Sequence, residues 1–210
     1  MHTQRARPLT LLNGLSAVRV AAVPVVMALV LGRDDLPWGE EAAAGVLAAA
    51  AITDFFDGYL ARRWHETTKL GTFLDTTADK LLVSGTLIAL VAVGATSAWI
   101  AFVIVARELV IMGVRAVAAA EGTLIVPSQW GKLKANLQFL ALLLAVLGVD
   151  RQAGPLAVDD WALVIAAVVT VLSGVDYVVR FWSSLGIAPV GEPAAAAEPQ
   201  LRRTPDESAV

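Results

Sequence analysis

The sequence predicts an all-α integral membrane protein with six transmembrane helices and a polar cavity in the cytoplasmic half of the bilayer. The first observation is composition, because 57% of the 210 residues are apolar or aromatic and only 17% are charged, whereas a soluble domain is nearer half apolar and a quarter charged. The second is that the apolar residues form six long runs. The third is that lysine and arginine residues are concentrated in every second connection between these runs.

Each apolar run is expected to form one membrane-spanning helix. A helix rises about 1.5 Å per residue, so about 20 residues cross roughly 30 Å of hydrocarbon. All runs except the fifth are this long, and we expect the fifth helix to begin earlier, near Gly131, with its lysines in the headgroup layer. Several runs are rich in Ala and Gly, which favours close helix packing in lipid. In chain order the runs cover residues 11–32, 42–61, 73–94, 98–120, 134–149 and 161–182.

The basic residues predict the orientation of these helices. Ten of the 16 lysine and arginine residues lie near the amino end, the second-to-third connection, the fourth-to-fifth connection or the carboxyl end. By the positive-inside rule, both termini are cytoplasmic and the chain crosses the plasma membrane six times. Residues 1–185 are therefore predicted to form one membrane domain. Residues 186–210, which are rich in Pro, Ala and Glu, are predicted to form a disordered cytoplasmic tail.

The composition also excludes several kinds of site. The chain has no cysteine, which excludes disulfides, thiolate catalysis and cysteine-ligated metals, and it has only two histidines. A net charge of −3 gives no electrostatic support for a nucleic-acid partner.

Apart from Lys134 and Arg180, which are counted above with the flanking basic residues, ten charged residues lie inside the predicted spans, and this predicts a site. Their positions in helices of alternating direction place them in the cytoplasmic half of the bilayer, and ionisable residues at membrane depth are costly and usually functional. The outer halves of the second, third and fourth spans contain no ionisable residue. The ten are Arg19, Asp54, Asp57, Asp75, Asp79, Lys80, Arg107, Glu108, Arg115 and Asp176.

Four aspartates form two pairs at helical spacing. Asp54 and Asp57 are three residues apart near the end of the second span, and Asp75 and Asp79 are four apart at the start of the third, so each pair shares a helix face. A short connection makes the two helices antiparallel neighbours, and the pairs are expected to face each other. Such hard oxygen ligands suit Mg²⁺, Mn²⁺ or Ca²⁺, and four carboxylates are enough for two ions. The alternative, helix caps or salt bridges, is disfavoured because each aspartate at the centre of a membrane helix costs about 2.5–3.5 kcal/mol.

These residues belong to a longer pattern. Residues 54–79 read D-x2-D-G-x2-A-R-x8-G-x3-D-x3-D, which resembles the motif of the CDP-alcohol phosphotransferase family, integral membrane enzymes with six helices per subunit that are usually homodimers. The resemblance implies that Asp54, Asp57, Asp75 and Asp79 bind two divalent cations, Mg²⁺ or Mn²⁺, and that Asp79 is also the general base. It further implies that Gly58, Ala61, Arg62 and Gly71 contact the CDP group. Either glycine could instead be a packing position between helices.

Basic residues of the later spans point to the acceptor. Arg107 and Arg115 are two helical turns apart, and Lys132 and Lys134 enter the fifth span from the same side. Together with Glu108, Gln138 and, in the first span, Asn13, Ser16 and Arg19, they resemble the phosphatidylglycerophosphate synthase branch of the family. The implied reaction joins CDP-diacylglycerol and sn-glycerol 3-phosphate to give phosphatidylglycerol phosphate and CMP, with Arg107, Arg115, Lys132 and Lys134 binding the acceptor's phosphate.

Several alternatives remain open at this point. The acceptor could be inositol phosphate, which would use the same basic pocket, or phosphatidylglycerol, which would need a groove open to lipid. The basic residues could bind membrane lipid headgroups instead, and Arg107 and Glu108 could belong to an internal ion-pair network. Arg19 could contact the nucleotide or pair with a carboxylate. A cation transporter is a more distant alternative, disfavoured because the charged residues end midway across the membrane.

Overall fold

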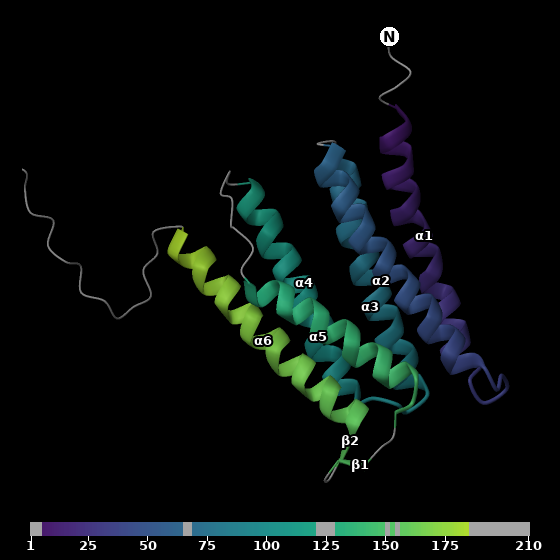
Figure 1. Cartoon of the computed structure of the whole chain (residues 1–210). Coiled ribbons are helices and arrows are strands. Elements are labelled where there is room, and N and C mark those ends of the chain that lie inside the picture. The colour runs from purple at the N-terminus through teal and green to yellow at the C-terminus, as the bar shows by residue number, and fades with distance from the viewer. Residues whose placement is uncertain (1–5, 65–68, 121–128, 150–151, 154–155, 185–210) are drawn as a thin grey trace, which may run out of the picture.

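The computed structural model describes residues 6–64, 69–120, 129–149, 152–153 and 156–184, but not the side chains of residues 6–15, 54–64, 69, 70, 72, 129, 130, 132, 152, 153 and 184. This part of the chain is almost entirely helical (Figure 1), which confirms the predicted all-α class. The helices are α1 (Ala6–Leu31), α2 (Gly39–Trp64), α3 (Lys69–Ala92), α4 (Ala98–Ala120), α5 (Gln129–Val146) and α6 (Val158–Ser184). Between α5 and α6, the two-residue strands β1 (Gln152–Ala153) and β2 (Leu156–Ala157) pair antiparallel.

The six predicted runs correspond to the six helices. The bounds of α4 are those expected, and α5 begins at Gln129, close to the predicted earlier start. The first three helices begin several residues before their apolar runs, because polar residues beside an apolar run can continue the same backbone hydrogen bonding. The predicted disordered tail, 186–210, lies outside the described residues.

Two helices end at a glycine in the left-handed conformation. Gly94 follows α3 with a φ of 73°, and the amide of Ala95 donates to the carbonyl of Leu90 at 2.8 Å. The same arrangement follows α5 at Gly148, where φ is 58°. A residue without Cβ adopts this conformation at little cost and satisfies the last helix carbonyls. This is why α3 ends slightly before the end of the predicted run 73–94.

The helices pack as two groups. α1 lies along α2 and α3, α6 lies along α4 and α5, and α3 also contacts α4 and α5 (Figure 1). The approach of α1 to α3 depends on Gly85, because a Cβ there would lie 2.6 Å from Cγ1 of Val23 and 3.2 Å from Sδ of Met27. Small residues at such crossings are typical of helices that pack in lipid.

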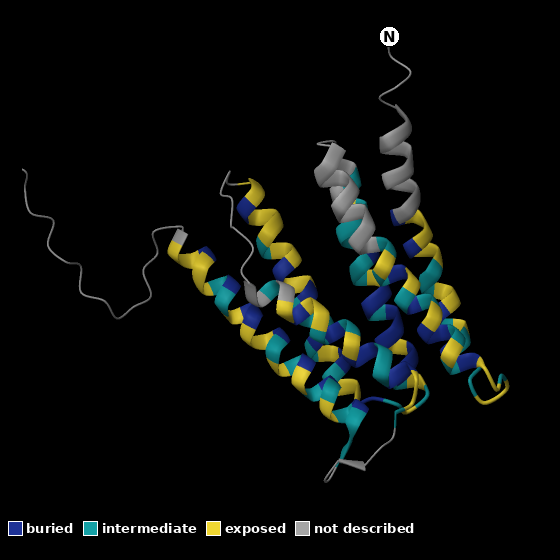
Figure 2. Cartoon of the chain, viewed as in Figure 1, coloured by how far each residue is buried: buried dark blue, intermediate teal, exposed yellow. Residues whose placement is uncertain are grey.

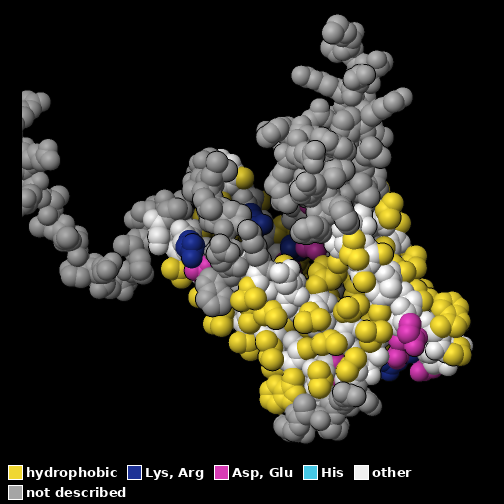
Figure 3. All heavy atoms as spheres, viewed as in Figure 1, with side chains coloured by type: hydrophobic (Ala, Val, Ile, Leu, Met, Phe, Trp, Pro, Cys, Tyr) yellow, Lys and Arg dark blue, Asp and Glu magenta, His cyan; other side chains and the backbone are white. Residues whose placement is uncertain are grey.

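The outer surface of the bundle is apolar. Buried residues lie mainly where the helices meet one another (Figure 2), and their apolar core includes Leu47, Leu82, Leu87, Ile104 and Leu142. Large hydrophobic side chains are also exposed on the outside of the helices, and Trp99 is 78% exposed. Hydrophobic side chains cover most of the described surface on the face shown in Figure 3, and charged side chains appear in few places. Extensive apolar surface of this kind is typical of a protein that contacts a membrane or another protein there.

One helix in the described residues is long and apolar enough to cross a membrane, Val158–Ser183. Shorter apolar segments lie at Ser16–Leu31 and Leu133–Val146. The described part of the chain is therefore mostly helical with one clear span, and the prediction of six crossings stays a prediction.

Candidate functional site

Charged side chains converge between α3, α4 and α5, inside an otherwise apolar bundle. They surround a cavity of about 860 Å³. The cavity is lined from α3 by residues that include Asp79 and Lys80, from α4 by residues that include Arg107, Glu108 and Arg115, and from α5 by residues that include Lys134. Three of the four predicted acceptor residues therefore line one cavity, together with the predicted base.

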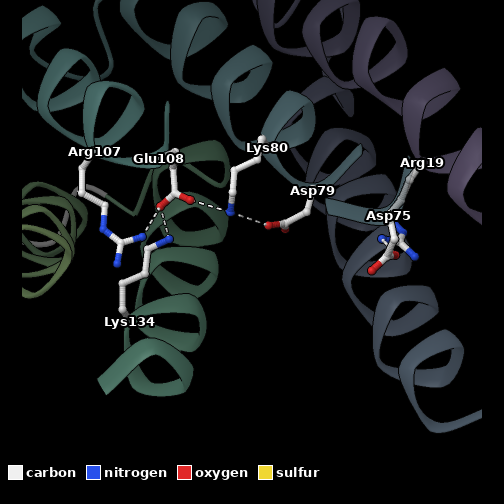
Figure 4. Close-up of polar contacts among 7 residues, drawn as sticks. All are labelled: Arg19, Asp75, Asp79, Lys80, Arg107, Glu108 and Lys134. Carbon is white, nitrogen blue, oxygen red and sulfur yellow. Dashed lines mark hydrogen bonds and ion pairs between the residues drawn. The ribbon is translucent and has the colours of Figure 1, made fainter. Parts of the chain in front are cut away.

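Glu108 is the centre of this cluster. Its side chain is 2% exposed, and its carboxylate contacts three cations from three helices (Figure 4). The ammonium of Lys80 lies 2.5 Å from Oε2, the guanidinium of Arg107 donates to Oε1 at 3.2 Å, and Lys134 donates to the same oxygen. A buried carboxylate needs such partners, because an unpaired charge in an apolar interior is strongly unfavourable. Arg107 and Glu108 therefore do belong to an internal ion-pair network, as one of the alternatives expected. That network lines the cavity.

Arg107 is also held from the opposite side by α6. Its Nε donates to the carbonyl of Thr170 at 3.1 Å and its Nη2 donates to the hydroxyl of Ser173 at 3.0 Å. Gly174 leaves room for the arginine, since a Cβ at this position would lie 3.1 Å from Cγ of Arg107. These contacts fix the guanidinium group at the cavity wall, which suits it to recognise an anion with a defined geometry.

Arg115 lies two turns further along α4. Its guanidinium carbon is 5.3 Å from the centre of the Tyr177 ring on α6, within the range of a cation–π contact. Tyr177 is buried, whereas Arg115 is exposed. The buried ring therefore supports the exposed guanidinium group of Arg115, which lines the cavity.

The two aspartates of α3 lie one turn apart and each contacts a cation. Oδ1 of Asp75 accepts a 2.8 Å hydrogen bond from Arg19 of α1, and Oδ2 of Asp79 lies 3.3 Å from Lys80 (Figure 4). Arg19 is 2% exposed, while Asp75 and Asp79 are 45% and 37% exposed. Of the two roles expected for Arg19, pairing with a carboxylate is therefore confirmed. Asp176 and Arg180, four residues apart on α6, form an ion pair on one turn of the helix at 3.0 Å.

The side chains of Asp54, Asp57, Gly58, Ala61, Arg62 and Lys132 lie outside the described residues. The backbone of α2 is helical through residues 54–64, and its carboxyl end lies at the same end of the bundle as the start of α3 (Figure 1). Gly71 is described and is partly exposed near the start of α3. Among the side chains that the structure does describe, no group of three or more acidic or histidine residues is placed to hold a metal ion. The predicted four-aspartate metal set stays a prediction.

Sequence reasoning assigned no role to several residues that build this site. They are Lys80, Thr170, Ser173, Gly174 and Tyr177, whereas Glu108 was expected only in the alternative of an ion-pair network with Arg107. Lys80 and Glu108 carried a signal, since a charged residue in an apolar run needs a partner at the same depth. The residues of α6 carried little signal, because polar or small residues in a membrane helix are common at packing positions.

Comparisons with known proteins agree with the motif. The family profile described as CDP-alcohol phosphatidyltransferase matches residues 9–172. The chain is 36% identical over 186 residues to a CDP-diacylglycerol–glycerol-3-phosphate 3-phosphatidyltransferase of Bacillus subtilis, covering 82% of this chain and 95% of the relative. It is 38% identical over 185 residues to a protein of Mycobacterium tuberculosis named "Probable phosphatidylglycerophosphate synthase", covering 87% and 86%. A phosphatidyltransferase of Sodalis glossinidius with the same name as the first is 37% identical over 169 residues, covering 78% and 90%.

Proposed function

The chain belongs to the CDP-alcohol phosphatidyltransferase family, and from this membership we propose that it transfers the phosphatidyl group of CDP-diacylglycerol to sn-glycerol 3-phosphate. The products are phosphatidylglycerol phosphate and CMP. The names of the relatives support both substrates. The observation that carries the choice of acceptor is the buried cationic cluster around Glu108, in a cavity that also contains the predicted base.

The charge of the cavity supports a phosphorylated acceptor. Among the described residues that line it, Lys80, Arg107, Arg115 and Lys134 are basic, and Asp79 and Glu108 are acidic, which leaves a positive surplus. Positive charge away from water is costly unless an anion is bound, and a phosphate monoester supplies that anion. The same surplus would repel a transported cation, so it argues against the transporter alternative.

The membrane topology belongs to the same proposal. We place α1 to α6 as six crossings with both termini and the cavity on the cytoplasmic side of the plasma membrane, because the flanking basic residues follow the positive-inside rule. The acyl chains of CDP-diacylglycerol would then lie in lipid beside the exposed apolar faces. A homodimer, usual in the family, completes the proposed assembly.

The predicted metal ligands fit divalent cations by their chemistry. Asp75 and Asp79 are partly exposed carboxylates one helical turn apart, and hard oxygen donors are what Mg²⁺ and Mn²⁺ prefer. With Asp54 and Asp57 they would hold two ions, which when bound neutralise the diphosphate and make CMP a better leaving group. Gly58, Ala61, Arg62 and Gly71 would orient the nucleotide.

The proposed role of Asp79 is to remove a proton. The acceptor's hydroxyl gives its proton to the Asp79 carboxylate as its oxygen forms a bond to the lipid-linked phosphorus. The bond between that phosphorus and the bridging oxygen breaks, and the oxygen leaves as part of CMP. The basic residues of the cavity would hold the acceptor's phosphate so that its hydroxyl faces Asp79.

The test is a panel of radiolabelled acceptors offered with CDP-diacylglycerol to the purified protein, read as lipid product. We expect product with glycerol 3-phosphate that depends on a divalent ion. Turnover with inositol phosphate or phosphatidylglycerol, but not with glycerol 3-phosphate, would overturn the acceptor assignment. Metal-dependent cation uptake into liposomes without CMP release would overturn the enzyme assignment.

One substitution tests the base. Asp79→Asn preserves the size of the side chain but removes its basicity, so we expect turnover to be lost while the melting temperature stays close to that of the unsubstituted protein. Normal turnover by this variant would exclude Asp79 as the base.

A further inference from the structure

Lys80 connects the predicted base to the cationic cluster. Its ammonium nitrogen lies 3.3 Å from Oδ2 of Asp79 on its own helix and 2.5 Å from Oε2 of Glu108 on α4 (Figure 4). The side chain lines the cavity and is 23% exposed. In the acidic motif it is only the residue after the last aspartate, so nothing in the motif gives it a role.

Glu108 cannot neutralise all of the cations that it contacts. One carboxylate meets Lys80, Arg107 and Lys134, and it is almost fully buried. Asp79 neutralises one more, but of the four basic residues that line the cavity, Lys80, Arg107, Arg115 and Lys134, two remain in excess of the carboxylates of Asp79 and Glu108. A phosphate monoester carries up to two negative charges and several strong acceptor oxygens, which matches this surplus.

The donor count of Lys80 fits contact with such a ligand. An ammonium group has three N–H donors. One donates to Oδ2 of Asp79, and the contact with Oε2 of Glu108 is an ion pair, so N–H donors are left for an oxygen in the cavity that Lys80 lines. In Figure 4 the ammonium group of Lys80 lies between Glu108 on one side and Asp79 on the other.

We propose that Lys80 is a further ligand of the acceptor's phosphate, that Glu108 positions it, and that its contact with Asp79 sets the phosphate beside the predicted base. This inference rests on the proposed function and deepens it, since it adds to the acceptor site a residue from the helix that carries the base. Because Lys80 and Asp79 are adjacent on α3, a phosphate bound by Lys80 lies at a defined place relative to Asp79. Arg107 and Lys134 belong to other helices.

The competing explanation is that Lys80 only neutralises two neighbouring carboxylates. The experiment compares Lys80→Gln and Lys80→Arg with Arg33→Gln, a charge-removing control on the α1–α2 turn, where Arg33 donates to the carbonyl of Val93 at 3.2 Å. The readouts are the Kd of glycerol 3-phosphate, measured by calorimetry in detergent without CDP-diacylglycerol, and separate KM values for both substrates.

We expect Lys80→Gln to weaken glycerol 3-phosphate binding and raise its KM by roughly 10- to 100-fold, the effect of losing a charged hydrogen bond. The KM for CDP-diacylglycerol should stay unchanged, and Lys80→Arg should restore most of the binding because it keeps the charge. An unchanged Kd in Lys80→Gln, or an equal loss in the control, would overturn the proposal.

A second measurement uses the unsubstituted protein and does not depend on a variant that folds. Reductive methylation of each lysine is followed by mass spectrometry with and without glycerol 3-phosphate. We expect the ligand to slow modification of Lys80 but not of Lys69, and equal rates at Lys80 in both conditions would contradict a direct contact. Protection of Lys80 without any CMP release from CDP-diacylglycerol would reject the proposed function while leaving the phosphate site in place.

Discussion

Replacing Glu108 with glutamine tests whether its carboxylate holds the cationic cluster together. The substitution preserves the shape of the side chain but removes the charge from a group that is 2% exposed. Breaking a buried ion pair in this way costs about 3–5 kcal/mol. We expect the lower end, about 3 kcal/mol, because Lys80 keeps its contact with Asp79 and Arg107 keeps its hydrogen bonds to α6. Domain stabilities are only about 5–15 kcal/mol, so the loss is a large fraction of the total.

The assay is thermal unfolding of the purified protein in detergent. At roughly 2–4 °C per kcal/mol for a chain of this size, the melting temperature of Glu108→Gln should fall by about 6–12 °C. Glycerol 3-phosphate should recover part of this loss and stabilise the variant more than the unsubstituted protein, because the phosphate restores negative charge beside Lys80 and Lys134.

The control is Asp176→Asn, which removes a carboxylate from a partly exposed pair with Arg180 on one helix. Such pairs contribute about 0–1 kcal/mol, so the melting temperature should change little. Equal melting temperatures for Glu108→Gln and Asp176→Asn would refute the idea that the buried carboxylate holds the three cations.

Three further predictions concern the cavity wall and its metals. Gly174→Ala adds a Cβ 3.1 Å from Cγ of Arg107, so we expect a destabilisation of about 1–3 kcal/mol and a raised KM for glycerol 3-phosphate. The control, Gly45→Ala, adds a Cβ with nothing within 4 Å and should show neither effect. Tyr177→Leu removes the ring under Arg115. It should raise the KM for glycerol 3-phosphate about two- to fivefold, the effect of losing an exposed cation–π contact. Tyr177→Phe retains the ring, so an equal effect of both substitutions would contradict the role of the ring. Chelation of divalent ions should stop CMP release and added Mg²⁺ should restore it, and release that continues in excess chelator would contradict the proposed metal requirement.

Features that depend on neighbouring residues could be predicted without the structure. The apolar runs predicted six helices, and each was found. The four-residue spacing of Asp176 and Arg180 favours a pair on one helix turn, and the structure has it. The glycine at position 94 ended α3 slightly before its predicted limit, because a left-handed residue stops a helix even where the apolar run continues.

Contacts between helices could not be predicted in the same way. The spacing of residues tells which face of a helix carries a charge, but it does not tell which other helix that face meets. Arg19 meets Asp75 across 56 positions, and Arg107 meets Thr170 across 63. These pairs depend on which helices pack together, and that packing depends on local shape, such as the absence of a side chain at Gly85.

The order of residues along the chain therefore specified the helical class, the acidic pattern and the family, because each is a property of composition or of spacing within one segment. Packing of the helices specified the cluster in which a single carboxylate, Glu108, meets cations from three helices beside Asp79. The physical reason is that the free energy of a buried charge depends on every group around it in space, and those groups come from segments far apart in the chain.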